Sequence, residues 1–499
     1  MGKLTDKVAK GVFWVLMEKF GIQAAHFVVT LVLARLLTPN DYGTVALLSV
    51  MIALGNVLVD CGLGRALVQK RDATQDDFNT VFYISIVLSL VLYAALFLSA
   101  PFVAEFYGIP ELKPMLRVLS LSIFFHAMNG VQGAELARKM KFKLSFRISW
   151  ATTLVSAITG IWMAFCGYGA WALVWSSVAG GVAGVAARQL VIRWRPTMTF
   201  SRDSARQMFS FGWKMLVGML VRDLYANLYT LVAGKCFSRA DLGFIRKGSH
   251  TAGFMMNTVD STIARVSFPA LAKMQDDPGR LRSAMRRMIR SSTFFVFPAM
   301  SVLAVVAEPL VVALFGEKWL PSAPFLRLAC FSCAVRPFST VNVQAIVARG
   351  HSNVFMALTI INRLIGIISM AISYRWGVYA FVASGTFSVG IGRLFVNSFP
   401  NWRYLGYTLR MQMLDVLPSL VMAGISAAAA FAAGMAFPRC SVMRIFCGIP
   451  AALAVYTALA ICVRSEALAD MLRAVRPALS KRLPVCDAVL SAVYRRVSR

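Results

Sequence analysis

Charged residues are scarce in this sequence, and their scarcity limits what the protein can be. Of its 499 residues only 15% are charged, whereas 58% are hydrophobic and the mean hydropathy is +0.66. A soluble protein of this length would carry about a quarter of its residues as charges. The composition therefore excludes an ordinary soluble enzyme and indicates a chain that is embedded in lipid.

The residue patterns of catalysis and metal binding are also missing. The nine cysteines are scattered singly, with no CxxC pair and no metal-ligand spacing, which predicts neither a disulfide framework nor a metal site. The pattern GxxxxGK[ST] does not occur, and no loop is long enough to fold a catalytic domain. No cleavage site follows the first apolar run, which predicts a retained N-terminus. We therefore expect no catalytic residues, no cofactor and no enzymatic activity.

Long apolar runs are what the sequence has in abundance. A membrane span needs about 20 apolar residues, and on that basis we expect an all-α integral membrane protein of about fourteen transmembrane helices. The first six are expected near 11–34, 43–64, 80–104, 114–134, 148–167 and 170–192. The next six are expected near 209–234, 248–270, 291–315, 322–348, 353–374 and 376–397, and two more near 415–437 and 442–463.

Basic residues outnumber acidic ones by 52 to 22, but their distribution argues against nucleic-acid binding. Most Lys and Arg residues fall in alternate loops, which is the positive-inside pattern of membrane proteins. This pattern predicts that both termini are cytoplasmic. One loop departs from it, because residues 235–247 carry four basic residues on the predicted outer side.

Two short stretches of the chain, two hundred positions apart, have similar sequences. Residues 34–43 read "ARLLTPNDYG" and residues 234–243 read "GKCFSRADLG". Aligned pairs are Thr38 and Ser238, Asp41 and Asp241, Gly43 and Gly243, and further on Asp60 and Asp260. We expect the threonine and serine to cap a helix and the glycines to relieve the backbone. A chance similarity of two turns is the alternative to a duplication.

A duplication with this spacing predicts two similar halves. Because six spans separate the copies, both halves enter the membrane from the same side and form parallel repeats. We expect an N-terminal lobe over 1–200, a C-terminal lobe over 201–400, two additional helices over 401–463 and a basic amphipathic cytoplasmic tail over 464–499. Rocking of the lobes would give alternating access to a cavity between them.

Several stretches of the sequence, most of them in the first lobe, also resemble a known family. The run "VVTLVLARLLTPNDYGTVALLSVMIALGNVLVDCGLGRALVQKRDATQDDFNTVF", with "APFVAEFYG", "GYGAWALV" and "ALFGEKWLPSAPFL", resembles bacterial polysaccharide exporters of the Wzx type, in the multidrug/oligosaccharidyl-lipid/polysaccharide flippase superfamily. The resemblance extends to about residue 400. It implies an inner-membrane flippase for an undecaprenyl-diphosphate-linked oligosaccharide, with two peripheral helices after the lobes. Besides this substrate and membrane lipid, polysaccharide polymerase and export machinery are candidate partners.

Other functions remain open at this point. A multidrug exporter of the same superfamily would favour a cavity rich in carboxylates, whereas the second half of this chain is rich in intramembrane arginine. A flippase for lipid-linked peptidoglycan precursors would share the helix plan. A membrane polymerase or glycosyltransferase, the enzymatic alternative, would require a sizeable outward loop, and the sequence has none.

Charged residues within predicted spans are the best candidates for a binding site, because they are costly in lipid. Arg222, Tyr225 and Tyr229 fall on one helical face, where an arginine could grip phosphate and the rings could contact a sugar. Asp260, Arg265, Arg336 and Arg363 lie in three further helices. Two aspartates, Asp223 and Asp260, cannot neutralise four arginines. We therefore predict a pyrophosphate site, against the alternative that the arginines are only paired structurally.

A second group of ionisable residues lies in the first lobe. Glu18 and His26 are eight positions apart on a rough common face, and Asp60 ends the second predicted helix. A carboxylate and a histidine could bind a proton or a sodium ion that drives transport. Pairing near the membrane surface is the structural alternative.

Overall fold

The computed structural model describes residues 21–61, 63–64, 67, 70, 73–139, 141–192, 195–437 and 441–469. Nearly all of these residues are helical, and no strand occurs within these ranges. The chain divides into two compact units, Met1–Gly243 and Phe244–Arg499, called unit 1 and unit 2 here. The predicted lobe boundary after residue 200 stays a prediction, and most of the predicted tail lies outside the described residues.

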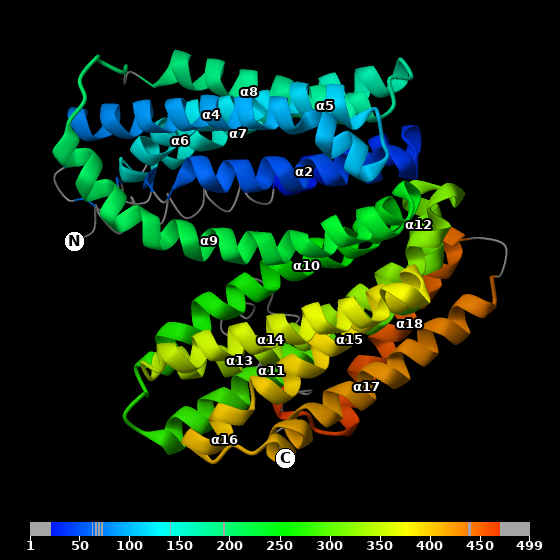
Figure 1. Cartoon of the computed structure of the whole chain (residues 1–499). Helices are drawn as coiled ribbons and strands as arrows, with labels where there is room; N and C mark the ends of the chain where they lie inside the picture. The colour runs from blue at the N-terminus through cyan, green and yellow to red at the C-terminus, as the bar shows by residue number, and fades with distance from the viewer. Residues whose placement is uncertain are drawn as a thin grey trace. The chain divides into compact units, whose positions relative to one another are not determined.

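Unit 1 is a bundle of long helices (Figure 1). It contains the helix Gly21–Leu36 and α2 (Pro39–Asp60), α4 (Gln75–Tyr107), α5 (Leu112–Leu119), α6 (Leu121–Arg138), α7 (Phe142–Phe165), α8 (Ala170–Val191) and α9 (Arg202–Cys236). Helix α7 packs along α8, α4 packs against α6, and α2 packs against both α6 and α9. The interior of unit 1 is therefore lined mainly by α2, α4, α6 and α8.

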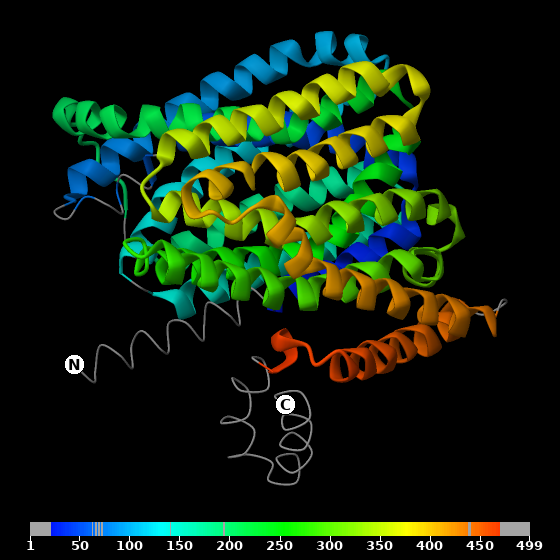
Figure 2. The same ribbon diagram turned by 90° about the horizontal axis from the view of Figure 1, so that it is seen from below.

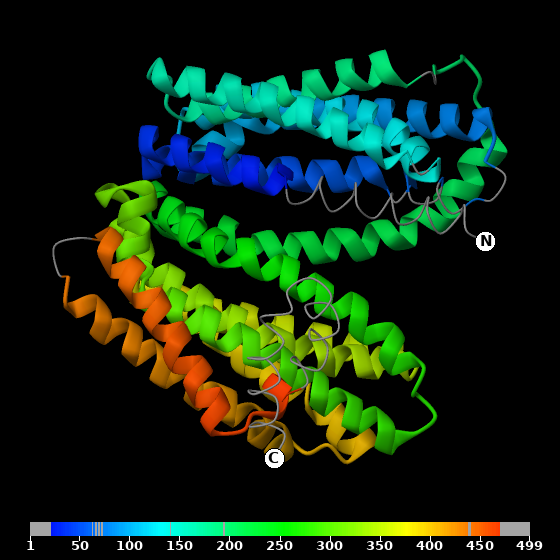
Figure 3. The same ribbon diagram turned by 180° about the vertical axis from the view of Figure 1, so that it is seen from behind.

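Unit 2 is built around α11 and α13, which pack against each other (Figure 3). Its helices are α10 (Arg239–Ala272, which begins just before the boundary), α11 (Pro278–Val305), α12 (Ala307–Phe315), η1 (Glu317–Ser322), α13 (Ala323–Ala348), α14 (Ser352–Ser373), η2 (Tyr374–Trp376), α15 (Val378–Val396), α16 (Phe399–Leu405), α17 (Leu409–Met435) and α18 (Ser441–Cys462). Helix α15 packs against α13 and α14.

Ten helices of the described residues are long and apolar enough to cross a membrane. The chain is thus an all-α, multi-pass membrane protein. Every predicted span overlaps a helix of the structure, although the count of about fourteen transmembrane helices stays a prediction.

The duplicated turn has the same local structure in both copies. Thr38 accepts a hydrogen bond from the Asp41 backbone N–H, and the Asp41 carboxylate accepts one from the Thr38 backbone N–H at 2.8 Å. Ser238 and Asp241 form the same reciprocal pair, with distances of 3.1 and 3.2 Å. The predicted helix caps are confirmed, and they start α2 and α10 at equivalent positions.

Gly43 and Gly243 act differently from the prediction. Neither has a positive φ, so the backbone conformation does not require glycine. A Cβ atom on Gly43 would lie 1.9 Å from the carbonyl oxygen of Arg239, and one on Gly243 would lie 2.1 Å from that of Pro39. Because Pro39 and Arg239 are themselves equivalent in the repeat, the two copies contact each other reciprocally. The glycines serve close helix approach, not backbone relief.

The predicted outer loop 235–247 is wrong in length. Helix α9 ends at Cys236 and α10 begins at Arg239, so most of the basic residues of that segment are helical. Lys247 is buried in unit 2, with its ammonium 4.0 Å from the centre of the Phe315 ring and 5.3 Å from that of Trp319. Contact with aromatic rings stabilises a buried cation. Lys247 is therefore an interior residue of unit 2 and not part of a solvated loop.

Helices α17 and α18, which follow the predicted lobes, pack along each other and against α11 (Figure 2). The hydroxyl of Tyr456 on α18 donates a 2.7 Å hydrogen bond to the backbone oxygen of Phe294 on α11, and the two rings are 5.1 Å apart. This contact and the polar network described below fix the pair to the rest of unit 2.

Candidate functional site

A cluster of polar side chains lies between α10 and α13 in unit 2. The guanidinium of Arg336 donates to the Asp260 carboxylate at 3.0 Å and to the amide oxygen of Asn257 at 2.9 Å. The hydroxyl of Thr340 donates to the other carboxylate oxygen of Asp260 at 2.6 Å. The side chains of Arg336 and Asp260 are 28% and 20% exposed, so the cluster is largely but not fully enclosed.

Helical spacing explains why these four residues meet. Asn257 and Asp260 are three residues apart on α10, and Arg336 and Thr340 are four apart on α13, so each pair lies on one helical face. Pro337 interrupts the hydrogen-bond ladder of α13 directly beside Arg336, because proline has no backbone N–H. The structure thus brings together two predicted site residues, Asp260 and Arg336, with two neutral partners.

The other predicted site residues of unit 2 stand apart from this ion pair. Arg265 follows Asp260 on α10 and has an exposed side chain; within the described residues it has no carboxylate partner. Arg363 lies half-buried on α14. Of the predicted site arginines of unit 2, Arg336 is paired with Asp260, whereas Arg265 has no ion pair with an acid among the described residues.

The predicted arginine and tyrosine face lies on α9, in unit 1. Arg222 donates to the carboxylate of its neighbour Asp223 at 2.7 Å. Tyr225 and Tyr229 follow on the same helix and are partly buried. Their grouping with the residues of unit 2 into one pyrophosphate site stays a prediction. Asp223 and Asp260, the two aspartates named in the sequence analysis, are each paired with one arginine, Arg222 and Arg336 respectively.

The structure describes two of the three ion-coupling candidates, His26 and Asp60. Glu18 lies outside the described residues, and His26 has an exposed side chain on the helix Gly21–Leu36. The histidine beside Asp60 is His126 of α6, with Nε2 at 3.5 Å from the carboxylate. Sequence spacing could not identify this partner, because the two residues lie on different helices.

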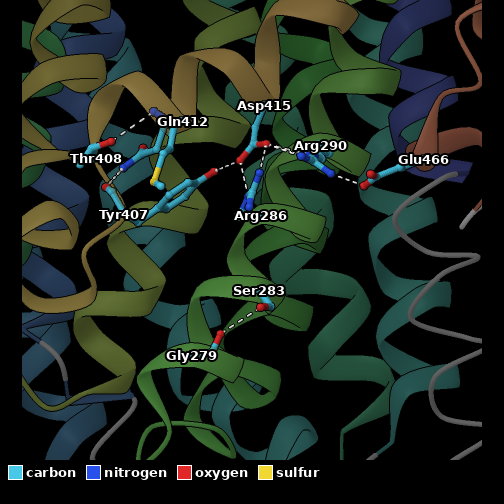
Figure 4. A network of polar contacts seen from close by, with 10 residues as sticks. Gly279, Ser283, Arg286, Arg290, Tyr407, Thr408, Gln412, Asp415 and Glu466 are labelled. Atoms are coloured by element: carbon cyan, nitrogen blue, oxygen red, sulfur yellow. Dashed lines mark hydrogen bonds and ion pairs between the residues drawn. The ribbon is translucent and has the colours of Figure 1, made fainter.

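A network around Asp415 was not predicted from the sequence (Figure 4). The Asp415 carboxylate on α17 accepts hydrogen bonds from Arg286 and Arg290 of α11, at 2.8 Å from each of two Arg286 nitrogens. The Tyr407 hydroxyl donates to it at 2.7 Å, and Arg290 also contacts Glu466. Burial, followed by this hydrogen bond, raises the pKa of Tyr407, which keeps its hydroxyl a donor.

The network shows how α17 is attached to α11. Asp415 has a side chain only 2% exposed, yet two guanidiniums and a phenol satisfy its oxygens. A single aspartate inside an apolar run was the available signal, but the arginines that meet it are more than a hundred residues away in the sequence. The role of this network is structural, since its charges balance one another.

No group of three or more His, Cys, Asp or Glu side chains gathers anywhere in the part of the chain that the structure describes.

Comparison with known proteins gives a consistent result. A family model described as "Polysaccharide biosynthesis protein" matches residues 32–324. The lipopolysaccharide biosynthesis protein WzxC of Escherichia coli K12 is 27% identical over 333 residues, which cover 66% of this chain and 67% of that protein. The succinoglycan biosynthesis transport protein ExoT of Rhizobium meliloti is 27% identical over 336 residues, covering 67% and 68%.

Solved structures share the fold at low sequence identity. The lipid II flippase MurJ in an inward closed conformation has a TM-score of 0.69 at 13% identity, covering 91% of this chain and 99% of that one. An inward-facing multidrug resistance transporter of the MATE family, in the MOP superfamily, has a TM-score of 0.61 at 15% identity, covering 77% and 94%. At these identities the similarity establishes the architecture alone.

Proposed function

The chain belongs to the polysaccharide biosynthesis protein family, and we propose that it translocates an undecaprenyl-diphosphate-linked oligosaccharide across the bacterial inner membrane. Membership of this family and the fold of the MOP transporters make it a membrane flippase, not an enzyme. The names of WzxC and ExoT support a lipid-linked saccharide precursor as substrate. Alternating access is the mechanism that we propose for this fold.

The ion pair of Arg336 and Asp260 is the observation on which this proposal depends most. Charged residues between the helices of a membrane protein are costly to bury, so those that are present usually line a substrate or ion path. Arg336 already presents a guanidinium whose planar fork matches phosphate oxygens, held in place by Asn257 and Asp260.

Ligand binding at this pair would use the donors that are still free. The Arg336 guanidinium has five N–H donors, of which Asp260 and Asn257 occupy two. The remaining donors can bind a diphosphate while Asp260 keeps its hydrogen bond from Thr340. Within unit 1, Tyr225 and Tyr229 of α9 are our candidates for contact with a sugar, because aromatic rings offer a flat apolar face with a polar tip.

The experiment is complementation of a host strain that lacks its own flippase for a known polysaccharide. Arg336→Ala should lower export at least tenfold, and Arg336→Lys should restore it only in part, because lysine keeps the charge but loses the fork. Arg265→Ala should also lower export. Arg327→Ala, which breaks an exposed ion pair with Glu308, is the matched control and should export normally.

The same strain tests the proposed location and substrate. Lipid-linked oligosaccharide should accumulate in cells with Arg336→Ala, at unchanged protein level. Reporter fusions after Lys143 and Arg287 should report cytoplasm if both termini are cytoplasmic, as the distribution of basic residues predicts. Normal export by alanine variants at Arg222, Arg265, Arg336 and Arg363 alike would contradict the proposed site.

A further inference from the structure

Helix α16 is a short helix that joins the ends of α15 and α17 in unit 2 (Figure 1). Its inner face is buried and consists of Pro400, Asn401 and Leu405. The side-chain amide of Asn401 donates to the backbone oxygen of Asn342 on α13 at 3.1 Å and to the side-chain oxygen of the same residue at 2.8 Å. These bonds fix the orientation of α16, so its outer face also points in a fixed direction.

The outer face of α16 is aromatic. Phe399 and Trp402 are 56% and 54% exposed, and their rings meet edge to face at 5.7 Å. Tyr404 is also exposed, and its ring stacks at 4.5 Å on that of His351, which directly precedes α14. Trp and Tyr side chains at the ends of membrane spans lie at the level of the lipid headgroups, because each ring is apolar and carries a polar group. The outer face of α16 has this character.

Arginines lie beside the aromatic face. Arg403 is an exposed residue of α16 itself. Arg349, which directly follows α13, donates to the backbone oxygen of Tyr404 at 3.0 Å. A Cβ atom on Gly406, the residue after α16, would lie 3.6 Å from Nη1 of Arg282. Residues from α11, α13 and α16 therefore bring guanidiniums to one short helix.

The arginines beside α16 differ from their neighbours in having no acidic partner. Arg286 and Arg290, further along α11, are both paired with Asp415. No ion pair with an acid of the described residues is formed by Arg282, Arg349, Arg403 or Arg410, the last an exposed residue in the first turn of α17. Asp276, in the turn between α10 and α11, is one acid against these four. A net positive charge therefore remains around α16.

Unpaired guanidiniums beside exposed rings call for a partner that is both anionic and amphipathic. A guanidinium binds phosphate oxygens well, and a phospholipid carries its phosphate directly above apolar chains. A soluble polyanion would match the arginines but would leave Phe399 and Trp402 in water. The distribution of basic residues predicts that this end of unit 2 is cytoplasmic, and the cytoplasmic leaflet carries anionic lipid.

We propose that α16 and the four arginines beside it form a docking surface for anionic phospholipid of the cytoplasmic leaflet. Headgroup phosphates accept hydrogen bonds from Arg349 and Arg403, while Phe399 and Trp402 pack against the upper parts of the acyl chains. Because Asn401 fixes α16 to α13, bound lipid holds this end of unit 2 at a set depth in the leaflet. The surface does not depend on which substrate the protein carries.

Lipid retention by the full-length protein in detergent, measured by native mass spectrometry, tests the surface. The wild type should retain phosphatidylglycerol several-fold more than phosphatidylcholine. The double variant Arg349→Ala/Arg403→Ala should lower that preference about threefold or more, whereas Arg349→Lys/Arg403→Lys should keep most of it, because lipid attraction depends mainly on the positive charge. Arg375→Ala is the matched control. This arginine is exposed beside Tyr374, after the other end of α14, and should not affect the preference.

The aromatic half of the surface and the nature of the anion are tested in the same samples. Trp402→Ser should lower retention of both lipids, and Trp402→Phe should not, because a ring is retained. Inorganic pyrophosphate should fail to displace phosphatidylglycerol, since it has no apolar part to contact the rings. Displacement by pyrophosphate would assign the arginines to a soluble anion and overturn the lipid surface.

The remaining outcomes are equally decisive. Equal retention of the two lipids by the wild type overturns the proposal, as does an unchanged preference in the double alanine variant or an equal loss in Arg375→Ala. Thermal unfolding in lipid-free detergent checks that the double alanine variant is folded. If it is not, Arg403→Glu at an exposed position replaces it and should lower the preference by itself. An unchanged preference in Arg403→Glu also overturns the proposal.

Discussion

Asp60 and Asp260 occupy the same position in two helices that begin alike, yet their surroundings are opposite. Both helices start after a capped turn, and both aspartates follow the helix start by the same number of residues. Asp260 is held by Arg336 and Thr340 in short hydrogen bonds. Asp60 faces a single histidine at 3.5 Å and is far more exposed. Two aspartates at equivalent positions of similar helices therefore have different electrostatic surroundings.

The interiors of the two units are more alike in charge. Unit 2 pairs its buried Asp415 with two arginines and a tyrosine. Unit 1 pairs its buried Asp77 with Lys70 and its buried Glu135 with Lys139. Unit 1 does have more buried polar atoms without a hydrogen-bond partner among the described residues. Such atoms are costly to bury, whereas a fully paired network stabilises one arrangement.

The largest effect on stability is expected at Asp415. Asp415→Asn leaves Arg286 and Arg290 facing an uncharged amide at a buried position, which should lower the free energy of unfolding by about 3 kcal/mol. Glu308→Gln is the control, because its pair with Arg327 is exposed and should contribute less than about 1 kcal/mol. Unfolding of the purified protein in detergent measures both. Equal effects would show that unit 2 does not depend on its buried pairs.

The two equivalent aspartates should differ when each is replaced by asparagine. Asp260→Asn removes a charge-assisted hydrogen bond to Arg336 and should cost about 2 kcal/mol. Asp60→Asn removes a longer, more exposed contact with His126 and should cost less than about 1 kcal/mol. The same unfolding measurement compares them. A larger loss at Asp60 would mean that its pair is structural after all.

Small and equal effects are expected at the two helix caps, where the two halves agree. Thr38→Ala and Ser238→Ala each remove one helix cap and should each cost about 1 kcal/mol. Because both caps form the same reciprocal pair with an aspartate, the two losses should be equal within error in the unfolding assay. Losses that differ twofold or more would argue that the turns resemble each other by chance.

Local features of this protein could be predicted from residues close together in the sequence. The helix caps at Thr38 and Ser238 followed from a serine or threonine three positions before an aspartate. Apolar run length located the helices, because a membrane imposes the same requirement on each one separately. The duplicated turn indicated the repeat, because its matching residues lie at one constant offset along the chain. These are properties that a helix has by itself.

Partners of ionisable residues could not be predicted in the same way. The sequence pattern grouped His26 with Glu18 and placed Asp60 in the same lobe, and it did not identify His126 as the histidine beside Asp60. It marked 235–247 as a loop between two predicted spans, whereas most of that segment is helical and Lys247 is buried against Phe315 and Trp319. Glycine in the turn indicated a conformational role, and the structure shows a helix contact instead.

The amino-acid sequence by itself therefore determined that the chain is a helical, multi-pass membrane protein with a repeated helix start, since hydropathy and capping act within a few residues. Only the tertiary structure decided which charges are neutralised and by what. Arg286 and Asp415 are separated by many turns of helix along the chain and meet at 2.8 Å. Electrostatic interactions depend on distance in space, and that distance is set by the packing of helices that sequence spacing does not encode.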